Sequence, residues 1–127
     1  MDLQDKHFFR VLASFRHAAA GVVYAFKTER NMKNHVFAAV LVLLFAYFFS
    51  VSRIEWLILL VAICLTMTLE LVNTAIEHAV NLYTMEYHPH AKMAKDIAAG
   101  AVLISSAISA IIGFAIFIPR LIELFAG

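Results

Sequence analysis

The sequence predicts an all-α integral membrane protein, in which an N-terminal amphipathic surface helix precedes three transmembrane helices. The first observation is composition: 63% of the 127 residues are hydrophobic and the mean hydropathy is +0.84, which is too apolar for a soluble domain. The second is a set of three apolar runs separated by short polar segments, and the third is a helical period near the N-terminus. The length suits one domain over residues 1–127.

Residues 7–28 have the pattern of an amphipathic helix. Apolar side chains recur at alternating spacings of four and three residues, at Phe8, Leu12, Phe15, Ala19, Val22 and Phe26. Polar and basic side chains fill the opposite face, so the segment is too polar to cross a bilayer. We expect it to lie in the membrane interface, with packing against other protein as the alternative.

Three later segments are long and apolar enough to approach the roughly 20 residues that a spanning helix needs. The expected spans are residues 34–52, 55–83 and 91–120. The polar break between the first two is short, which predicts a tight helical hairpin, and Trp56 follows it as an interfacial anchor.

Two prolines are expected to mark the limits of the last span. Pro89 makes continuation of the preceding helix unfavourable, so the last helix should begin near Ala91. Its apolar run is rich in Ala, Ser and Gly, which permit close contact between helices in lipid. Pro119 is expected to end the run, and Arg120 to lie at the far interface.

Lysine and arginine are distributed unequally between the two sides of the predicted membrane. Most lie before the first span or beside the second loop, which predicts a cytoplasmic N-terminus and an outward C-terminus in the inner membrane of a bacterial cell. This orientation puts a set of charged and polar side chains on the cytoplasmic side, namely Arg10, Glu29, Glu77, Glu86, His88, Lys95 and Asp96. Their shared side indicates a single site.

The second span carries an unusual polar stripe. Glu70, Asn73 and Glu77 are spaced i, i+3 and i+7, which places them on one face of a helix, and Asn81 extends this face by another turn. A carboxylate near hydrocarbon costs about 2.5 kcal/mol or more even on the lenient insertion scale. The stripe is therefore expected to handle protons, cations or phosphates, the alternative being structural carboxylates bonded to neighbouring helices.

Carboxylates together with Lys and Arg at one membrane face suit a metal-bound polyphosphate. Glu29 and Glu77 could hold Mg²⁺, which takes hard oxygen ligands, while Lys95 and Arg10 could neutralise phosphate. Glu70 lies about 10 Å deeper than Glu77 along the helix, where a base would meet a hydroxyl entering from the bilayer. No Walker-type or kinase-type Gly-rich loop is present, so phosphoryl transfer is one candidate among several.

Other classes of function compete with phosphoryl transfer. A small transporter subunit could use the carboxylates for protons or cations, and a structural subunit would leave them unexplained. The sequence His88-Pro89-His90 lacks further ligands at the spacing of a transition-metal site. The N-terminal helix lacks a dense basic cluster, so attraction to anionic lipid explains its charge better than nucleic acid does.

Two elements of the sequence resemble a known family. The run Glu70-Leu71-Val72-Asn73-Thr74-Ala75-Ile76-Glu77, followed by Ala94-Lys95-Asp96, resembles the prokaryotic diacylglycerol kinases. The resemblance extends over nearly the whole chain. It implies a small integral membrane kinase that assembles as a homotrimer and uses ATP and Mg²⁺.

The resemblance also implies a role for each matching residue. Glu70 would be the general base that deprotonates the lipid hydroxyl, Asn73 would orient the reacting groups, and Glu29 and Glu77 would bind Mg²⁺. The positions that would contact nucleotide are Arg10, His17, Glu86, His88, Lys95 and Asp96. Gram-negative members have Tyr at the position of His17.

The amino-acid sequence of two segments favours one branch of the family. Glu29-Arg30-Asn31-Met32-Lys33 and His88-Pro89-His90-Ala91-Lys92 are similar to the Gram-positive branch, whose members phosphorylate undecaprenol. Undecaprenol kinase is therefore the preferred expectation, and diacylglycerol kinase is the alternative. The preference comes from the resemblance, because physical reasoning does not connect these residues to an isoprenoid.

Overall fold

The computed structural model describes residues 3–126, with side chains from residue 7 onward, and it is entirely helical over this range apart from short connections. The helices are α1 (Leu3–Thr28), α2 (Arg30–Phe48), α3 (Arg53–Tyr83) and α4 (Pro89–Ala126). The last three are long and apolar enough to cross a membrane, while α1 is much less apolar. These helices confirm the predicted all-α, multi-pass membrane fold.

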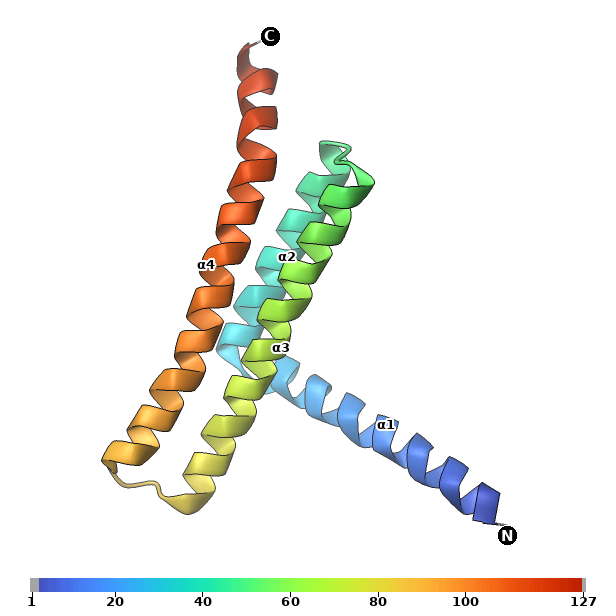
Figure 1. The fold of residues 1–127 in the computed structure, drawn as a ribbon, viewed down its shortest axis with the longest axis vertical. Helices are drawn as coiled ribbons and strands as arrows, with labels where there is room; N and C mark the ends of the chain where they lie inside the picture. Colours follow the sequence, from blue (N-terminus) through green and yellow to red (C-terminus); the bar gives the residue numbers. More distant parts are fainter. Residues whose placement is uncertain (1–2, 127) are drawn as a thin grey trace.

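The three spanning helices form an antiparallel bundle (Figure 1). Helices α2 and α3 make a tight hairpin, and α4 returns alongside α3, with which it packs most extensively. Helix α1 leaves the bundle obliquely from the start of α2 and slopes toward the end that carries the α3–α4 loop (Figure 1). This arrangement places the α1–α2 junction beside the lower half of α3.

The α2–α3 turn is held by a Schellman motif. Ser50 adopts a left-handed conformation with φ of 49°, its backbone N–H donates to the carbonyl of Tyr47, and the N–H of Val51 donates to that of Ala46. Ala46 and Val51 are both buried, which supplies the apolar contact typical of this motif. The turn therefore fixes the hairpin although no glycine occupies the left-handed position.

Helix α3 begins directly after this turn with a capping box. The Ser52 side chain accepts a hydrogen bond from the backbone N–H of Glu55 at 3.3 Å, and the Glu55 carboxylate accepts one from the backbone N–H of Ser52 at 2.7 Å. Two N–H groups that the first helical turn cannot satisfy are thereby bonded.

Helix α4 is longer than the predicted last span. It begins at Pro89, two residues before the expected start near Ala91, because proline is favourable in the first helical turn, where its missing N–H is not needed. It also continues through Pro119 to Ala126. Proline is tolerated inside spanning helices where neighbouring groups satisfy the freed backbone.

Arg120 shows how this extension is held. Its guanidinium donates to the carbonyl of Ile116 at 2.7 Å and to the carboxylate of Glu55 at 2.8 Å. The ion pair joins the last part of α4 to the first turn of α3, so the helix has both an internal and a tertiary contact beside the proline.

Hydroxyl groups join α3 to α4 in the middle of the bundle. Thr66 Oγ1 lies 2.9 Å from Ser105 Oγ and 3.0 Å from Ser109 Oγ, and Ser109 also donates to the carbonyl of Ala62 at 3.3 Å. Lipid supplies no hydrophobic force between helices, so such hydrogen bonds and small residues carry much of the association.

Thr66→Val is expected to lower the free energy of unfolding by about 0.5–1.5 kcal/mol, because two interhelical hydrogen bonds are lost at nearly constant volume. The measurement is an SDS titration in mixed micelles, followed by the fluorescence of Trp56, the single tryptophan. Thr68→Val makes the same change at an exposed position of α3 and should have little effect. Equal stability of the two variants would contradict the prediction.

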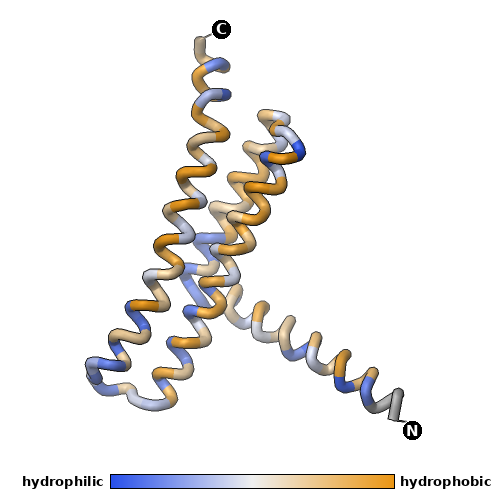
Figure 2. The backbone as a smooth tube through the Cα atoms, viewed as in Figure 1, coloured by the Kyte–Doolittle hydropathy of each residue, from blue (hydrophilic) through white to orange (hydrophobic). Residues whose placement is uncertain are grey.

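Polar residues are concentrated at one end of the bundle (Figure 2). They occupy the start of α2, the last turns of α3 and the first turns of α4, while the opposite halves of these helices are mainly apolar apart from the α2–α3 turn and the last turns of α4 (Figure 2). A small apolar core lies in that opposite half, formed by Ala46, Val51, Leu59, Ile116 and Phe117. The polar end is therefore where a site is to be sought.

Candidate active site

The polar stripe of α3 faces the interior of the polar half. Glu70 and Asn73 are buried, with 2% and 5% of their surfaces exposed. The side-chain amide of Asn73 donates to Glu77 Oε1 at 3.0 Å, so it holds the partly buried carboxylate of Glu77 in place. Asn73 Oδ1 is also buried and has no hydrogen-bond partner within residues 3–126.

The α1–α2 junction brings a third carboxylate to this stripe. Glu29 interrupts the helix with an extended backbone, at φ −83° and ψ 122°, and its side chain makes no capping hydrogen bond to α2. Its carboxylate therefore remains available to face α3, where Glu29 Oε1 lies 3.9 Å from His78 Nε2. Tyr24 of α1 packs edge-on against the His78 ring, with centroids 5.7 Å apart, which positions the junction.

Glu70 is the most enclosed of the three carboxylates. His35 Nε2 on α2 lies 3.9 Å from Glu70 Oε2, and only 3% of the Glu70 side chain is exposed. Asn31, Glu29 and Glu77 also lie close enough to act on the charge of Glu70. Three acidic side chains from two parts of the chain therefore share the polar half of the bundle, with Glu70 about two helical turns deeper than Glu77.

Sequence reasoning missed His35 and Asn31, and the available signal was their spacing. They are four residues apart at the start of an apolar run, which places them on one face of α2. Only the packing of α2 against α3 shows that this face meets Glu70. His78 lies outside the polar stripe of α3, and in the structure its partner is Glu29.

Lys95 reaches the outer end of the stripe from α4. Its Nζ donates to Asn81 Oδ1 at 2.7 Å, and Asn81 lies one turn beyond Glu77 on the same face of α3. This ammonium group is consequently held toward the mouth of the carboxylate cluster. Asp96, the next residue, forms an ion pair with Lys92 on the surface of α4.

The other predicted nucleotide-binding residues are not gathered around the carboxylates. Arg10 and His17 are exposed on α1, where it extends away from the bundle. Glu86 and His88 are exposed in the α3–α4 loop, and the His88 ring packs against Tyr83 at 6.4 Å and against His90 at 5.7 Å. One chain therefore assembles the carboxylates and Lys95, and it leaves these four side chains open to solvent.

The oxygen donors at the site suit a hard cation such as Mg²⁺. Within the residues whose positions are described, no group of three or more His, Cys, Asp or Glu is arranged to hold a metal ion. Mg²⁺ needs fewer protein ligands, because it commonly takes one or two carboxylates and completes its shell with phosphate oxygens and waters. Glu29, Glu77 and the buried Oδ1 of Asn73 fit that donor set.

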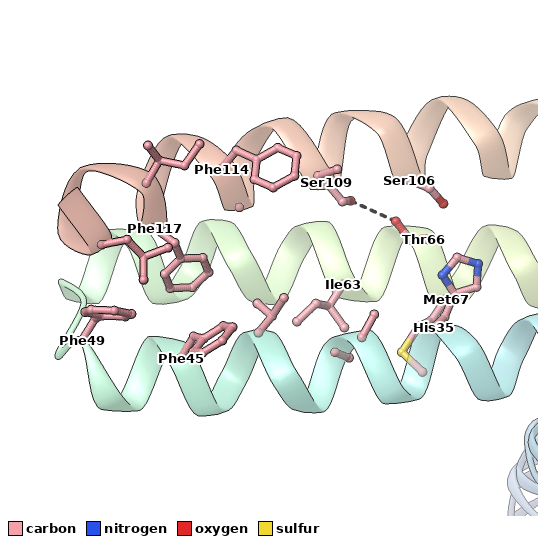
Figure 3. Close-up of a pocket in the computed structure, with 17 residues that line it drawn as sticks. His35, Phe45, Phe49, Ile63, Thr66, Met67, Ser106, Ser109, Phe114 and Phe117 are labelled. Carbon is pink, nitrogen blue, oxygen red and sulfur yellow. Dashed lines mark hydrogen bonds between the residues drawn. The ribbon is translucent and has the colours of Figure 1, made fainter. Parts of the chain in front are cut away.

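A cavity of about 490 Å³ lies between α2, α3 and α4, and its lining includes His35, the neighbour of Glu70. His35, Thr66, Met67 and Ser106 lie at one end, and aromatic rings lie at the other (Figure 3). Those rings are Phe45, Phe49, Phe114 and Phe117. The lining is predominantly apolar, so the cavity suits a hydrocarbon chain whose polar end is near His35.

Comparison with known proteins decides the family. Residues 16–117 match the model described as prokaryotic diacylglycerol kinase. The chain belongs to this family. Membership makes it a membrane lipid kinase, which confirms the resemblance seen in its motifs.

Several curated relatives of this kinase cover most of its length. It is 48% identical over 112 residues to the undecaprenol kinase of Bacillus subtilis, covering 88% of this chain and 91% of the relative. It is 44% identical over 115 residues to a diacylglycerol kinase of Synechocystis, covering 90% of this chain and 66% of that protein. It is 29% identical over 104 residues to the diacylglycerol kinase of Escherichia coli K12, covering 82% of this chain and 85% of that protein.

Proposed function

We propose that this kinase transfers the terminal phosphate of ATP to the hydroxyl of undecaprenol, with Mg²⁺, to give undecaprenyl phosphate and ADP. Diacylglycerol is the alternative acceptor. The site would lie at the cytoplasmic face of the bacterial inner membrane, with the N-terminus in the cytoplasm, as the distribution of Lys and Arg indicates.

The observation that carries the proposal is that Glu29, Glu70 and Glu77 share the polar half of a bundle whose spanning helices are mainly apolar. Three carboxylates in such a place repel each other and lose hydration, so a cation is needed to offset them. The ammonium group of Lys95 is held close by, at the solvent side of the stripe. The carboxylates would bind a positively charged metal ion, and the ammonium group above them would bind a negatively charged polyphosphate.

Glu70 is suited to the role of general base. It is buried next to His35, which lines the apolar cavity, so a lipid hydroxyl would reach it without leaving the membrane interior. The carboxylate would accept the hydroxyl proton while the oxygen attacks the phosphate. Asn73 would orient the reacting groups, because its amide group is fixed by the hydrogen bond to Glu77.

Glu29 and Glu77 are the proposed ligands of Mg²⁺, and Asn73 Oδ1 lies within the same donor set. The ion would neutralise charge on the transferring phosphate. Lys95 would bind phosphate oxygens directly. Further nucleotide contacts are proposed for the exposed side chains of Arg10, His17, Glu86, His88 and Asp96.

The choice of undecaprenol is supported by the undecaprenol kinase at 48% identity and by the two segments similar to the Gram-positive branch. The cavity between the spanning helices offers an apolar environment for part of a long chain. We also propose a homotrimer, because large apolar side chains cover the outer faces of α2, α3 and α4 and small residues line α4. Crosslinking in a mild detergent would test that assembly.

The substrate proposal predicts the outcome of a direct comparison. Purified kinase in one type of mixed micelle should phosphorylate undecaprenol with a kcat/KM at least about tenfold above that for diacylglycerol, a difference of about 1.4 kcal/mol in transition-state binding. The measurement is transfer of labelled phosphate from ATP at matched mole fractions of each lipid. A preference for diacylglycerol would reverse the assignment, and ion flux in liposomes without lipid phosphorylation would exclude both.

A further inference from the structure

The gap between His35 and Glu70 is the starting observation. Their nearest atoms, Nε2 and Oε2, are 3.9 Å apart, which is too long for a hydrogen bond. A single oxygen atom placed about 2.8 Å from each would bond to both of them. The spacing therefore fits one bridging hydroxyl group better than a direct contact.

The surroundings indicate where such a hydroxyl comes from. His35 lines the 490 Å³ cavity, so one of the two side chains that flank the gap borders an apolar space between the spanning helices. Figure 3 shows the His35 ring at the end of that space where the polar groups Thr66 and Ser106 also lie. Ser106 Oγ is buried and has no hydrogen-bond partner among the side chains described. A molecule with a hydrocarbon chain and one terminal hydroxyl matches a cavity that is polar at one end and apolar along the rest.

We propose that His35 is a second catalytic residue, whose Nε2–H donates a hydrogen bond to the hydroxyl oxygen of the lipid alcohol held against Glu70. This inference rests on the proposed lipid kinase function and adds a residue to it. It requires the histidine tautomer that carries its proton on Nε2. The occupant of the cavity is then the hydrocarbon chain of the same alcohol.

The arrangement orients the attacking oxygen. The hydroxyl donates its proton toward Glu70 Oε2 and accepts a hydrogen bond from His35, so one lone pair remains to attack phosphorus. As the new O–P bond forms, the hydroxyl proton passes to Glu70, and the bond from phosphorus to the departing nucleoside diphosphate breaks. His35 keeps its own proton throughout, and its contribution is to fix the direction of the oxygen.

The first test measures binding without nucleotide, using farnesol and its methyl ether as probes. Both have the same chain, but the ether cannot donate to Glu70 and is hindered in accepting from His35. Wild-type protein should bind the alcohol about tenfold more tightly than the ether, which corresponds to about 1.4 kcal/mol. In His35→Leu the preference should fall below about twofold, and His35→Gln should restore most of it, because the glutamine amide can donate from a position similar to Nε2.

A matched control is available on α1. His7→Leu makes the same chemical change at an exposed position and should leave the preference for the alcohol unchanged. If His35→Leu weakened the binding of both probes to the same extent, His35 would only shape the cavity, and the inference would be overturned. Failure of wild-type protein to bind either probe would also overturn it, because the cavity would then be filled by another occupant, such as a second copy of the chain.

The second test measures turnover. With the lipid alcohol, kcat in His35→Leu should fall about 10- to 100-fold, the range for losing a hydrogen bond to a group that develops charge. The ATP concentration that gives half-maximal activity should be unchanged, whereas a general loss of folding would alter it. Absence of lipid phosphorylation by the wild type would refute the proposed function itself. Normal turnover of His35→Leu by an active kinase would refute only the role of His35.

Discussion

Glu70→Gln is expected to abolish turnover while leaving nucleotide binding intact. The amide keeps the shape of the buried side chain but cannot accept a proton, so kcat should fall by about 10²- to 10⁴-fold. Two measurements are needed, lipid phosphorylation and the binding of a non-hydrolysable ATP analogue to the same preparation. The analogue should bind as it does to the wild type, because the proposed phosphate ligands are unchanged.

Glu123→Gln provides the matched control for this variant. Glu123 is exposed near the end of α4, far along the chain from the carboxylate cluster, so its loss should not affect kcat. Turnover by Glu70→Gln within a few fold of the wild type would remove Glu70 from the role of base. Loss of analogue binding together with turnover would instead indicate that Glu70 supports the nucleotide site.

Glu29→Gln and Glu77→Gln should each raise the Mg²⁺ concentration needed for half-maximal activity by about 10- to 100-fold, since changes in metal ligation and its supporting groups have effects of this size. The amide oxygen introduced by Glu77→Gln can still accept the hydrogen bond from Asn73, so this variant isolates the effect of charge. The measurement is a titration of activity with Mg²⁺ at fixed ATP. The double variant should cost less than the sum of the single ones, because both carboxylates would serve one ion.

The opposite result is equally clear. If kcat fell in these variants while half-saturation by Mg²⁺ stayed constant, Glu29 and Glu77 would not be metal ligands. They would then act only through their charge on Glu70 and through the contact of Glu29 with His78. Comparison with Glu123→Gln would show that the effect belongs to the cluster and does not follow from the loss of any acidic side chain.

The fold could be predicted because its signals are local. Spans were recognised from runs of apolar residues, and the stripe of Glu70, Asn73 and Glu77 from helical spacing, neither of which depends on distant parts of the chain. Helix α4 extends beyond the predicted span because proline was treated by its cost within an isolated helix. The ion pair between Arg120 and Glu55, far apart in the sequence, shows how tertiary contacts accompany that extension.

The candidate site was predictable only in part, because it depends on contacts between distant segments of the chain. Residue type, predicted membrane side and the resemblance all pointed to Glu29 and Lys95, but the contact of His35 with Glu70 depends on how two helices pack. Spacing within α2 gave no indication of which residue of α3 it would meet. The predicted side of the membrane was also too coarse a criterion. Arg10 and Glu86 were assigned to the same side as the carboxylates, yet both are exposed, one on α1 and the other in the α3–α4 loop.

The depth of Glu70 within α3 affects how such an enzyme would respond to its surroundings. A base enclosed among spanning helices meets its acceptor by diffusion in two dimensions, so the relevant concentration is the mole fraction of the alcohol in the bilayer. Adding inert phospholipid would slow the reaction even when every molecule of alcohol remains in the sample, whereas adding water would not. The reaction rate would therefore depend on the surface density of the acceptor alcohol in the membrane.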